Sequence, residues 1–181
     1  MIGLATTIAI NALAIGVLFT VHESGHYLAG LSIGIPRDRL RLRLLSIPPH
    51  VALVDGDGTP VSPSAFDRYL DLLTTHTTSV HQQYRFVAGG HVLEWLVVVA
   101  ITFVALGSGT DSVTTTASLL VYWSLVITGL YLIIDAAGTI GRGYPHGDAS
   151  GQWALAPLLT IVFYLGFFGT YLWLARVLGL L

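Results

Sequence analysis

The chain contains no cysteine and no lysine, and only 10% of its 181 residues are charged, against about 25% in an average soluble domain. Without cysteine, neither disulfides nor thiolate metal sites are available. The formal net charge of −2 gives no sign of a nucleic-acid partner. Hydrophobic residues make up 54% of the chain, and this excess together with the shortage of charge predicts a membrane protein.

Four apolar runs are long enough to cross a bilayer, which takes about 20 residues each. They cover residues 1–35, 84–106, 117–140 and 153–180. A signal peptide is the alternative for the first run, but no basic segment precedes it and no small-residue cleavage pattern interrupts it. We therefore expect a single-domain, all-α polytopic membrane protein with about four transmembrane helices embedded in the lipid bilayer.

The arginines predict an orientation. The connection over residues 36–83 and its flank carry six Arg and residues 141–152 carry Arg142, whereas residues 107–116 carry none. Because basic loops stay in the cytoplasm, we expect both arginine-containing loops to be cytoplasmic and the N-terminus to lie outside.

The first cytoplasmic loop has strand and turn patterns. Residues 37–44 read RDRLRLRL, an alternation with period two that predicts a strand with Arg on one face and mostly Leu on the other. Strands at 51–54 and near Val61 flank DGDG at 55–58, which predicts a hairpin. A calcium loop is the alternative for these acids, but Pro60 stands where such a loop has a glycine.

A short amphipathic helix follows in the same loop. Residues 64–76 show a helical pattern, and Ser64 and Asp67 have the spacing of a capping box. We expect this helix to lie at the membrane interface.

The first apolar run also contains HESGH at residues 22–26, a complete HExxH motif. Positions four apart share one face of a helix, so His22 and His26 can bind one Zn²⁺. Glu23 can take a proton from water, whose pKa zinc lowers to about 7, and later return it to a leaving group. Random placement would give this motif roughly 0.003 times in such a chain. A metal-free, hydrogen-bonded His pair is the alternative, and a zinc site would need a third ligand.

Three segments resemble the site-2 protease family of intramembrane zinc metalloproteases. HESGHYLAG at 22–30 is similar to that family's H-E-x-G-H segment, RFVAGG at 85–90 to its Ala-Gly-Pro helix, and YPHGDA at 144–149 to the region of its third zinc ligand, an Asp. Gly90 stands in place of the family's Pro, the usual Asn of that helix is missing, and Ala149 replaces a Gly. The resemblance implies a minimal, divergent member, with one Zn²⁺ per chain.

Two aspartates are candidates for the third ligand. Asp148 follows Pro145 and Gly147, a bend able to turn its carboxylate toward the membrane interior, and it matches the family's Pro-then-Asp order. Asp135 is the alternative, because an acid inside an apolar segment is costly without a partner. Asp135 could instead hold substrate backbone or orient a ligand.

The second apolar run carries two further polar residues. His91 and Glu94 are three apart and hence neighbours on one helix face. They could line the catalytic cavity, pair with each other or bind a second metal. His146, close to Asp148, is an alternative ligand or an exposed loop residue.

These patterns predict an intramembrane zinc endopeptidase that cleaves a locally unwound transmembrane segment of another protein. The edge of the Arg/Leu strand could hold that segment by main-chain pairing. Two other classes stay open: a non-proteolytic zinc-binding membrane protein, and a metal or proton transporter that uses His91, Glu94 and Asp135 as stations. The absence of an evident inverted repeat speaks against transport.

Overall fold

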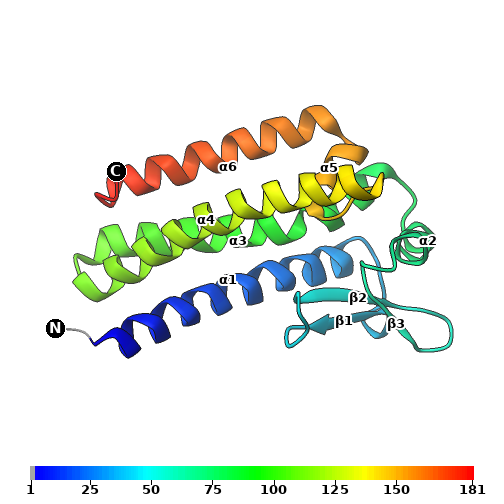
Figure 1. The fold of residues 1–181 in the computed structure, drawn as a ribbon, viewed down its shortest axis with the longest axis horizontal. Coiled ribbons are helices and arrows are strands. Elements are labelled where there is room, and N and C mark those ends of the chain that lie inside the picture. Colours follow the sequence, from blue (N-terminus) through cyan, green and yellow to red (C-terminus); the bar gives the residue numbers. More distant parts are fainter. Residues whose placement is uncertain (1–2) are drawn as a thin grey trace.

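Four long helices dominate the computed structural model, which describes residues 3–181. They are α1 (Leu4–Ser32), α3 (Val80–Ser108), α4 (Asp111–Arg142) and α6 (Pro157–Val177). Each is long and apolar enough to cross a membrane, which confirms the predicted polytopic fold. The start of α1, the C-terminus and the α3–α4 turn lie at one end of the bundle, and the sheet, α2 and α5 lie at the other (Figure 1). Residues 1 and 2, where the first predicted span begins, lie outside the described residues.

Two glycines end the central helices. Gly109 and Gly143 adopt φ of 61° and 76°, left-handed conformations that close α3 and α4. Both helices are longer than the predicted spans at 84–106 and 117–140. Hydropathy detects only the apolar part of a helix, whereas the hydrogen-bond ladder continues through the polar residues up to these caps.

The connection before α6 differs from the prediction. Residues 141–152 were expected to form a loop and the last span to start at 153, but Asp148–Leu155 form the short helix α5. The last span starts only at Pro157, because Ala156 leaves the helical region (φ −156°, ψ 81°) and proline suits the first helical position.

The loop after α1 forms a small antiparallel sheet of order β1-β2-β3. It contains β1 (Leu40–Arg43), β2 (His50–Val54) and β3 (Pro60–Val61). The predicted strand at 37–44 is shorter than expected, since Arg37–Arg39 form a 3₁₀ turn. Only Leu40 of β1 is buried, so the strand lacks the expected continuous Leu face.

The predicted β2–β3 hairpin is confirmed. The amide of Asp55 donates to the Thr59 carbonyl (3.1 Å), and Gly58 turns the chain with φ 81°. The Asp55 carboxylate accepts from the backbone amides of Asp57 and Thr59 (3.0 and 2.9 Å) and from Arg68. The Asp55 carboxylate thus stabilises its own turn by accepting these hydrogen bonds. This fits a hairpin, whereas in a calcium loop the carboxylate would bind the ion.

Helix α2 (Phe66–His76) starts two residues later than predicted. The expected capping box does not form, because Ser64 Oγ donates to Ser62 Oγ (3.1 Å) and the N-cap is Ala65. The hydroxyl of Tyr69 donates to the Val51 carbonyl (3.0 Å), which fixes α2 on the sheet. A hydrophobic cluster joins the sheet and α2 to the ends of α1 and α3: Ile33, Ile35, Leu40, Val51, Leu53, Leu73 and Phe86.

Helices α1 and α3 touch backbone to backbone at the HExxH motif. A Cβ on Gly25 would lie only 2.9 Å from Gly90 Cα, and one on Gly89 only 2.5 Å from the Ala29 Cβ. Small residues permit such close approach between membrane helices. The motif is therefore pressed against α3.

Candidate metal centre

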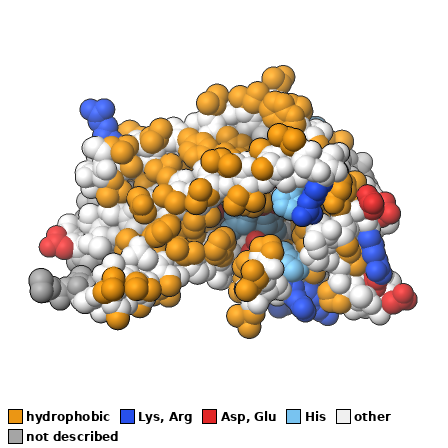
Figure 2. Space-filling view, viewed as in Figure 1, with side chains coloured by type: hydrophobic (Ala, Val, Ile, Leu, Met, Phe, Trp, Pro, Cys, Tyr) orange, Lys and Arg blue, Asp and Glu red, His pale blue; other side chains and the backbone are white. Residues whose placement is uncertain are grey.

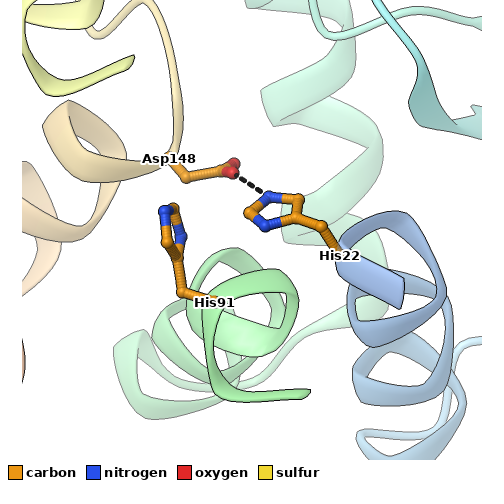
Figure 3. A group of neighbouring side chains, drawn as sticks. All are labelled: His22, His91 and Asp148. Atoms are coloured by element: carbon orange, nitrogen blue, oxygen red, sulfur yellow. Dashed lines mark hydrogen bonds and ion pairs between the residues drawn. The ribbon is translucent and has the colours of Figure 1, made fainter. Parts of the chain in front are cut away.

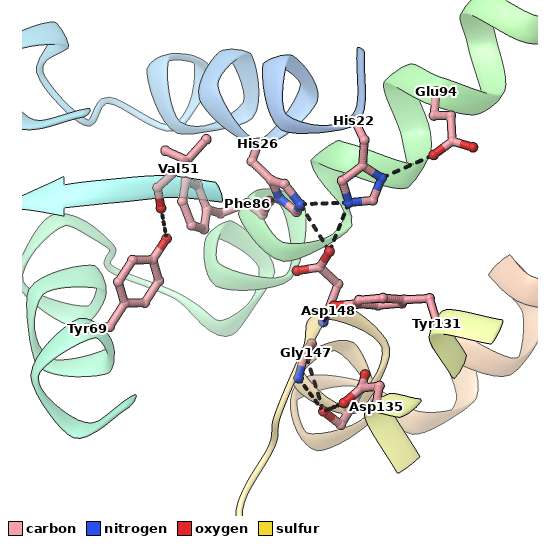
Figure 4. Close-up of polar contacts among 11 residues, drawn as sticks. His22, His26, Val51, Tyr69, Phe86, Glu94, Tyr131, Asp135, Gly147 and Asp148 are labelled. Carbon is pink, nitrogen blue, oxygen red and sulfur yellow. Dashed lines mark hydrogen bonds and ion pairs between the residues drawn. The ribbon is translucent and has the colours of Figure 1, made fainter. Parts of the chain in front are cut away.

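His22 and His26 lie one turn apart on the face of α1 that meets α3 and α5 (Figure 4). Their Nε2 atoms are 3.2 Å apart. Oδ2 of Asp148, the first residue of α5, lies 3.0 Å from Nε2 of His22 and 3.1 Å from Nε2 of His26. With bonds of 2.0–2.1 Å, the ligand atoms of a tetrahedral Zn²⁺ are roughly 3.3 Å apart. The three atoms form a triangle of nearly that size.

Hydrogen bonds on the far side of each ring set the tautomers. Nδ1 of His26 lies 2.9 Å from the Phe86 carbonyl oxygen, which can only accept, so this nitrogen carries the proton. Nδ1 of His22 faces Oε2 of Glu94 at 3.1 Å, and the other Glu94 oxygen accepts from Ser124 (2.8 Å). In the neutral form of each ring, Nε2 therefore presents its lone pair toward Asp148.

The contacts of Asp148 favour its charged form. Burial favours the neutral acid, yet protonated imidazoles of His26 and His22 that donate from Nε2 lower the pKa of this carboxyl well below its usual range. A bound Zn²⁺ would take the place of those two protons, because without protons or a cation the two nitrogen lone pairs and the carboxylate oxygen repel one another.

The backbone of α3 leaves room for that cation. A Cβ on Gly90 would stand 2.5 Å from Nε2 of His26 and 2.6 Å from Nε2 of His22. Glycine at this position keeps the space between the rings clear. Two imidazoles and one carboxylate suit Zn²⁺, and three protein ligands are the number found in catalytic sites, where the fourth position stays open.

Asp135, the alternative ligand, holds α5 in place. One of its oxygens accepts from the backbone amide of Ser150 (2.8 Å), and the other from the Ser150 hydroxyl (2.5 Å). The hydroxyl of Tyr131, one turn earlier on α4, accepts from the Asp148 amide (2.9 Å). Asp148 thus reaches the histidines from a helix start that α4 fixes (Figure 4).

The remaining candidates differ in their surroundings. Glu23 is only 9% exposed and adjoins His22 in the chain. Glu94 does not pair with His91, as one expectation had it, but with His22 and Ser124. His91 is buried with its ring 4.6 Å from that of His22. His146 is exposed.

Sequence reasoning missed the groups that support the ligands: the Phe86 carbonyl, the Ser124 hydroxyl and the Tyr131 hydroxyl. Tyr131 and Asp135 are four apart on α4, so they share a face, and this spacing was a usable signal. A backbone carbonyl such as that of Phe86 has no signal in the sequence, because every residue carries one.

The three ligand side chains are largely but not fully buried. The side chains of His22, His26 and Asp148 are 14%, 9% and 24% exposed. Figure 2 shows histidine and acidic atoms at the base of a hollow that hydrophobic side chains border.

Comparison with known proteins finds no family model, characterised protein or solved structure that matches the chain.

Proposed function

We propose that this protein is an intramembrane zinc endopeptidase of the kind that its motifs resemble, the site-2 protease family. The observation that carries the proposal is the meeting of three lone-pair donors, His22 Nε2, His26 Nε2 and Asp148 Oδ2, within 3.2 Å of one another on helices able to span a membrane. These residues would hold one Zn²⁺. Bound zinc supplies a Lewis acid and makes water a nucleophile near neutral pH.

Glu23 is the residue proposed to move the proton. It adjoins the first ligand, and its 9% exposure keeps it out of bulk solvent. A carboxylate in this place takes a proton from the attacking water and gives it to the leaving amine as the peptide bond breaks.

The substrate class follows from the surroundings. Apolar side chains border a hollow at whose base histidine and acidic atoms lie, so a hydrophobic segment of another membrane protein suits it (Figure 2). That segment must unwind locally, since an intact helix keeps its carbonyls hydrogen-bonded. Strand β1 forms one edge of the sheet and pairs on one side with β2. Its other side could hold the unwound segment by main-chain pairing.

A transporter would use Glu94 and Asp135 as mobile stations for an ion. Both acids are instead tied into hydrogen bonds that position His22 and α5. A non-proteolytic zinc protein would share the same metal site, so only a cleavage assay separates it from a protease.

The deciding test is cleavage of a transmembrane reporter in proteoliposomes by the wild type and by Glu23→Gln. We expect Glu23→Gln to keep its zinc and to lose cleavage by a factor of about 10² or more. Ser24→Ala is the control, because the Ser24 hydroxyl only donates to the Thr20 carbonyl of its own helix. Undiminished cleavage by Glu23→Gln would eliminate the mechanism, and zinc binding without any wild-type cleavage would favour a non-proteolytic role.

A further inference from the structure

His91 is a buried polar side chain without a visible partner. It is 2% exposed, and within residues 3–181 its Nδ1 atom has no hydrogen-bond partner. Four aromatic rings surround it, with centroids 5.6–6.4 Å away: Tyr131, Phe163, Tyr164 and Phe167. Buried polar groups are rarely left unpaired, so such an atom indicates a partner that arrives with a ligand.

The ring of His91 is directed toward the metal centre. It stands edge-on to His22, and one of its nitrogens, a His22 nitrogen and an Asp148 oxygen all lie within 4.8 Å of one another (Figure 3). Glu94, one turn along α3, pairs with His22 and Ser124 and makes no hydrogen bond with His91 Nδ1. The space beside the His22 and Asp148 ligand atoms lies next to one of the His91 ring nitrogens and is a place where a ligand can meet the ring.

A fourth metal ligand is one role for such a residue, but the ligand triangle speaks against it. His22, His26 and Asp148 already supply three ligand atoms 3.0–3.2 Å apart. A fourth protein ligand would close the position that a hydrolase leaves open for water or substrate.

We propose that a ring N–H of His91 donates a hydrogen bond to the oxygen that occupies this open position, which during proteolysis is the carbonyl oxygen of the scissile peptide bond. The proposal rests on the proposed function for the identity of that oxygen. A donor fixed in a water-poor site stabilises the negative charge that develops on the oxygen during attack. The rings around His91 provide such a site and hold the imidazole in one orientation.

The test uses a small probe and does not depend on cleavage. The protein is loaded with Co²⁺, and acetohydroxamate, whose oxygens bind metal, is titrated while the visible spectrum is recorded. His91→Phe should keep its metal and bind acetohydroxamate roughly 10- to 100-fold more weakly, since a hydrogen bond to a charged oxygen is lost. His91→Gln, which keeps an N–H donor, should recover part of the affinity. His81→Phe, an exposed histidine of the same helix, should match the wild type.

The other outcomes overturn either this proposal or the proposed function. Loss of metal from His91→Phe and His91→Gln would make His91 a ligand, and unchanged acetohydroxamate affinity in both would make it a packing residue. A wild type that holds Co²⁺ but not acetohydroxamate has no open position. A wild type that binds neither Co²⁺ nor Zn²⁺ ends the proposed function as well, whereas normal acetohydroxamate binding without proteolysis ends only the proposed function.

Discussion

Asp148 and Asp135 lie near the same helix start, yet their oxygens have different neighbours. Oδ2 of Asp148 faces two imidazole nitrogens, whereas both oxygens of Asp135 accept hydrogen bonds from Ser150. The proposed Zn²⁺ would need the negative charge of Asp148, whereas Asp135 needs only oxygens that accept hydrogen bonds.

Substituting the two acids should therefore separate them. We expect Asp148→Asn to weaken zinc binding by about 100-fold or more, because the amide oxygen carries no charge. Asp135→Asn should retain stoichiometric zinc with affinity reduced by about 10-fold, since one side-chain oxygen still accepts from Ser150. Chelator competition on the two purified variants measures both values. Zinc lost from Asp135→Asn but kept by Asp148→Asn would reverse the assignment.

At the scale of helices, the space between the two imidazoles depends on how α1 packs on α3. Gly90 lies under both rings, so a methyl group there pushes them apart or fills the place of the ion.

We predict that Gly90→Ala lowers zinc affinity by at least about 10-fold, because the new Cβ would stand 2.5 Å from Nε2 of His26. Gly107→Ala, on the same helix, is the matched control, since a Cβ at Gly107 would meet nothing within 4 Å. Isothermal titration with Zn²⁺ after chelation provides the comparison. Equal affinity in the two variants would show that the rings do not need this space.

The β2–β3 hairpin depends on the charge of Asp55. Backbone hydrogen bonds from Thr59 and Asp57, with Arg68 nearby, lower the pKa of this carboxyl in the folded protein. A lowered folded-state pKa contributes stability above the unfolded value of about 3.9, and this contribution is lost as the pH falls through the folded-state pKa.

Asp55→Asn should accordingly lower the melting temperature at pH 7, and its difference from the wild type should shrink as the pH falls below about 4. Asp57→Asn removes an exposed acid of the same turn and should change little at either pH. Thermal unfolding of the detergent-solubilised proteins at the two pH values tests this. A deficit of Asp55→Asn that stays constant down to pH 3 would contradict the role of the charge.

Much of the helical framework was predictable from sequence, because apolar length alone identifies a span. The HExxH spacing likewise placed His22 and His26 on one face. The partners of Glu94 and Asp135 were not predictable, since they depend on how α1, α4 and α5 meet, and these segments are distant in the chain. The α5 helix was missed because its first five residues, 148–152, are small or polar and were assigned to the loop, while 153–155 were assigned to the apolar run.

At the scale of the whole molecule, a bound ion would join α1 to α5, two segments whose ligands are 126 and 122 residues apart. An ion that binds only the folded state stabilises it, by about 4 kcal/mol when free zinc is 1,000 times the dissociation constant.

Removal of zinc should thus lower the melting temperature of the wild type by several degrees. His26→Ala should melt at the same temperature with and without chelator, because losing one of three ligands removes most of the affinity. Differential scanning fluorimetry in detergent, with EDTA and with EDTA followed by excess Zn²⁺, is the measurement. A wild-type melting temperature that changes neither with EDTA nor with the later excess of Zn²⁺ would argue against a metal site in the folded protein.

The separation of the ligands along the chain has a consequence for biosynthesis. A ribosome making this protein releases HExxH with the first span, but the carboxylate that completes the triangle belongs to residue 148, after three of the four long helices. Until then the nascent protein carries two histidines and a base without the third ligand. Under the proposed function, a nascent chain without α5 would lack the third ligand, so it would not cut the insertion machinery or neighbouring chains before residue 148 is in place.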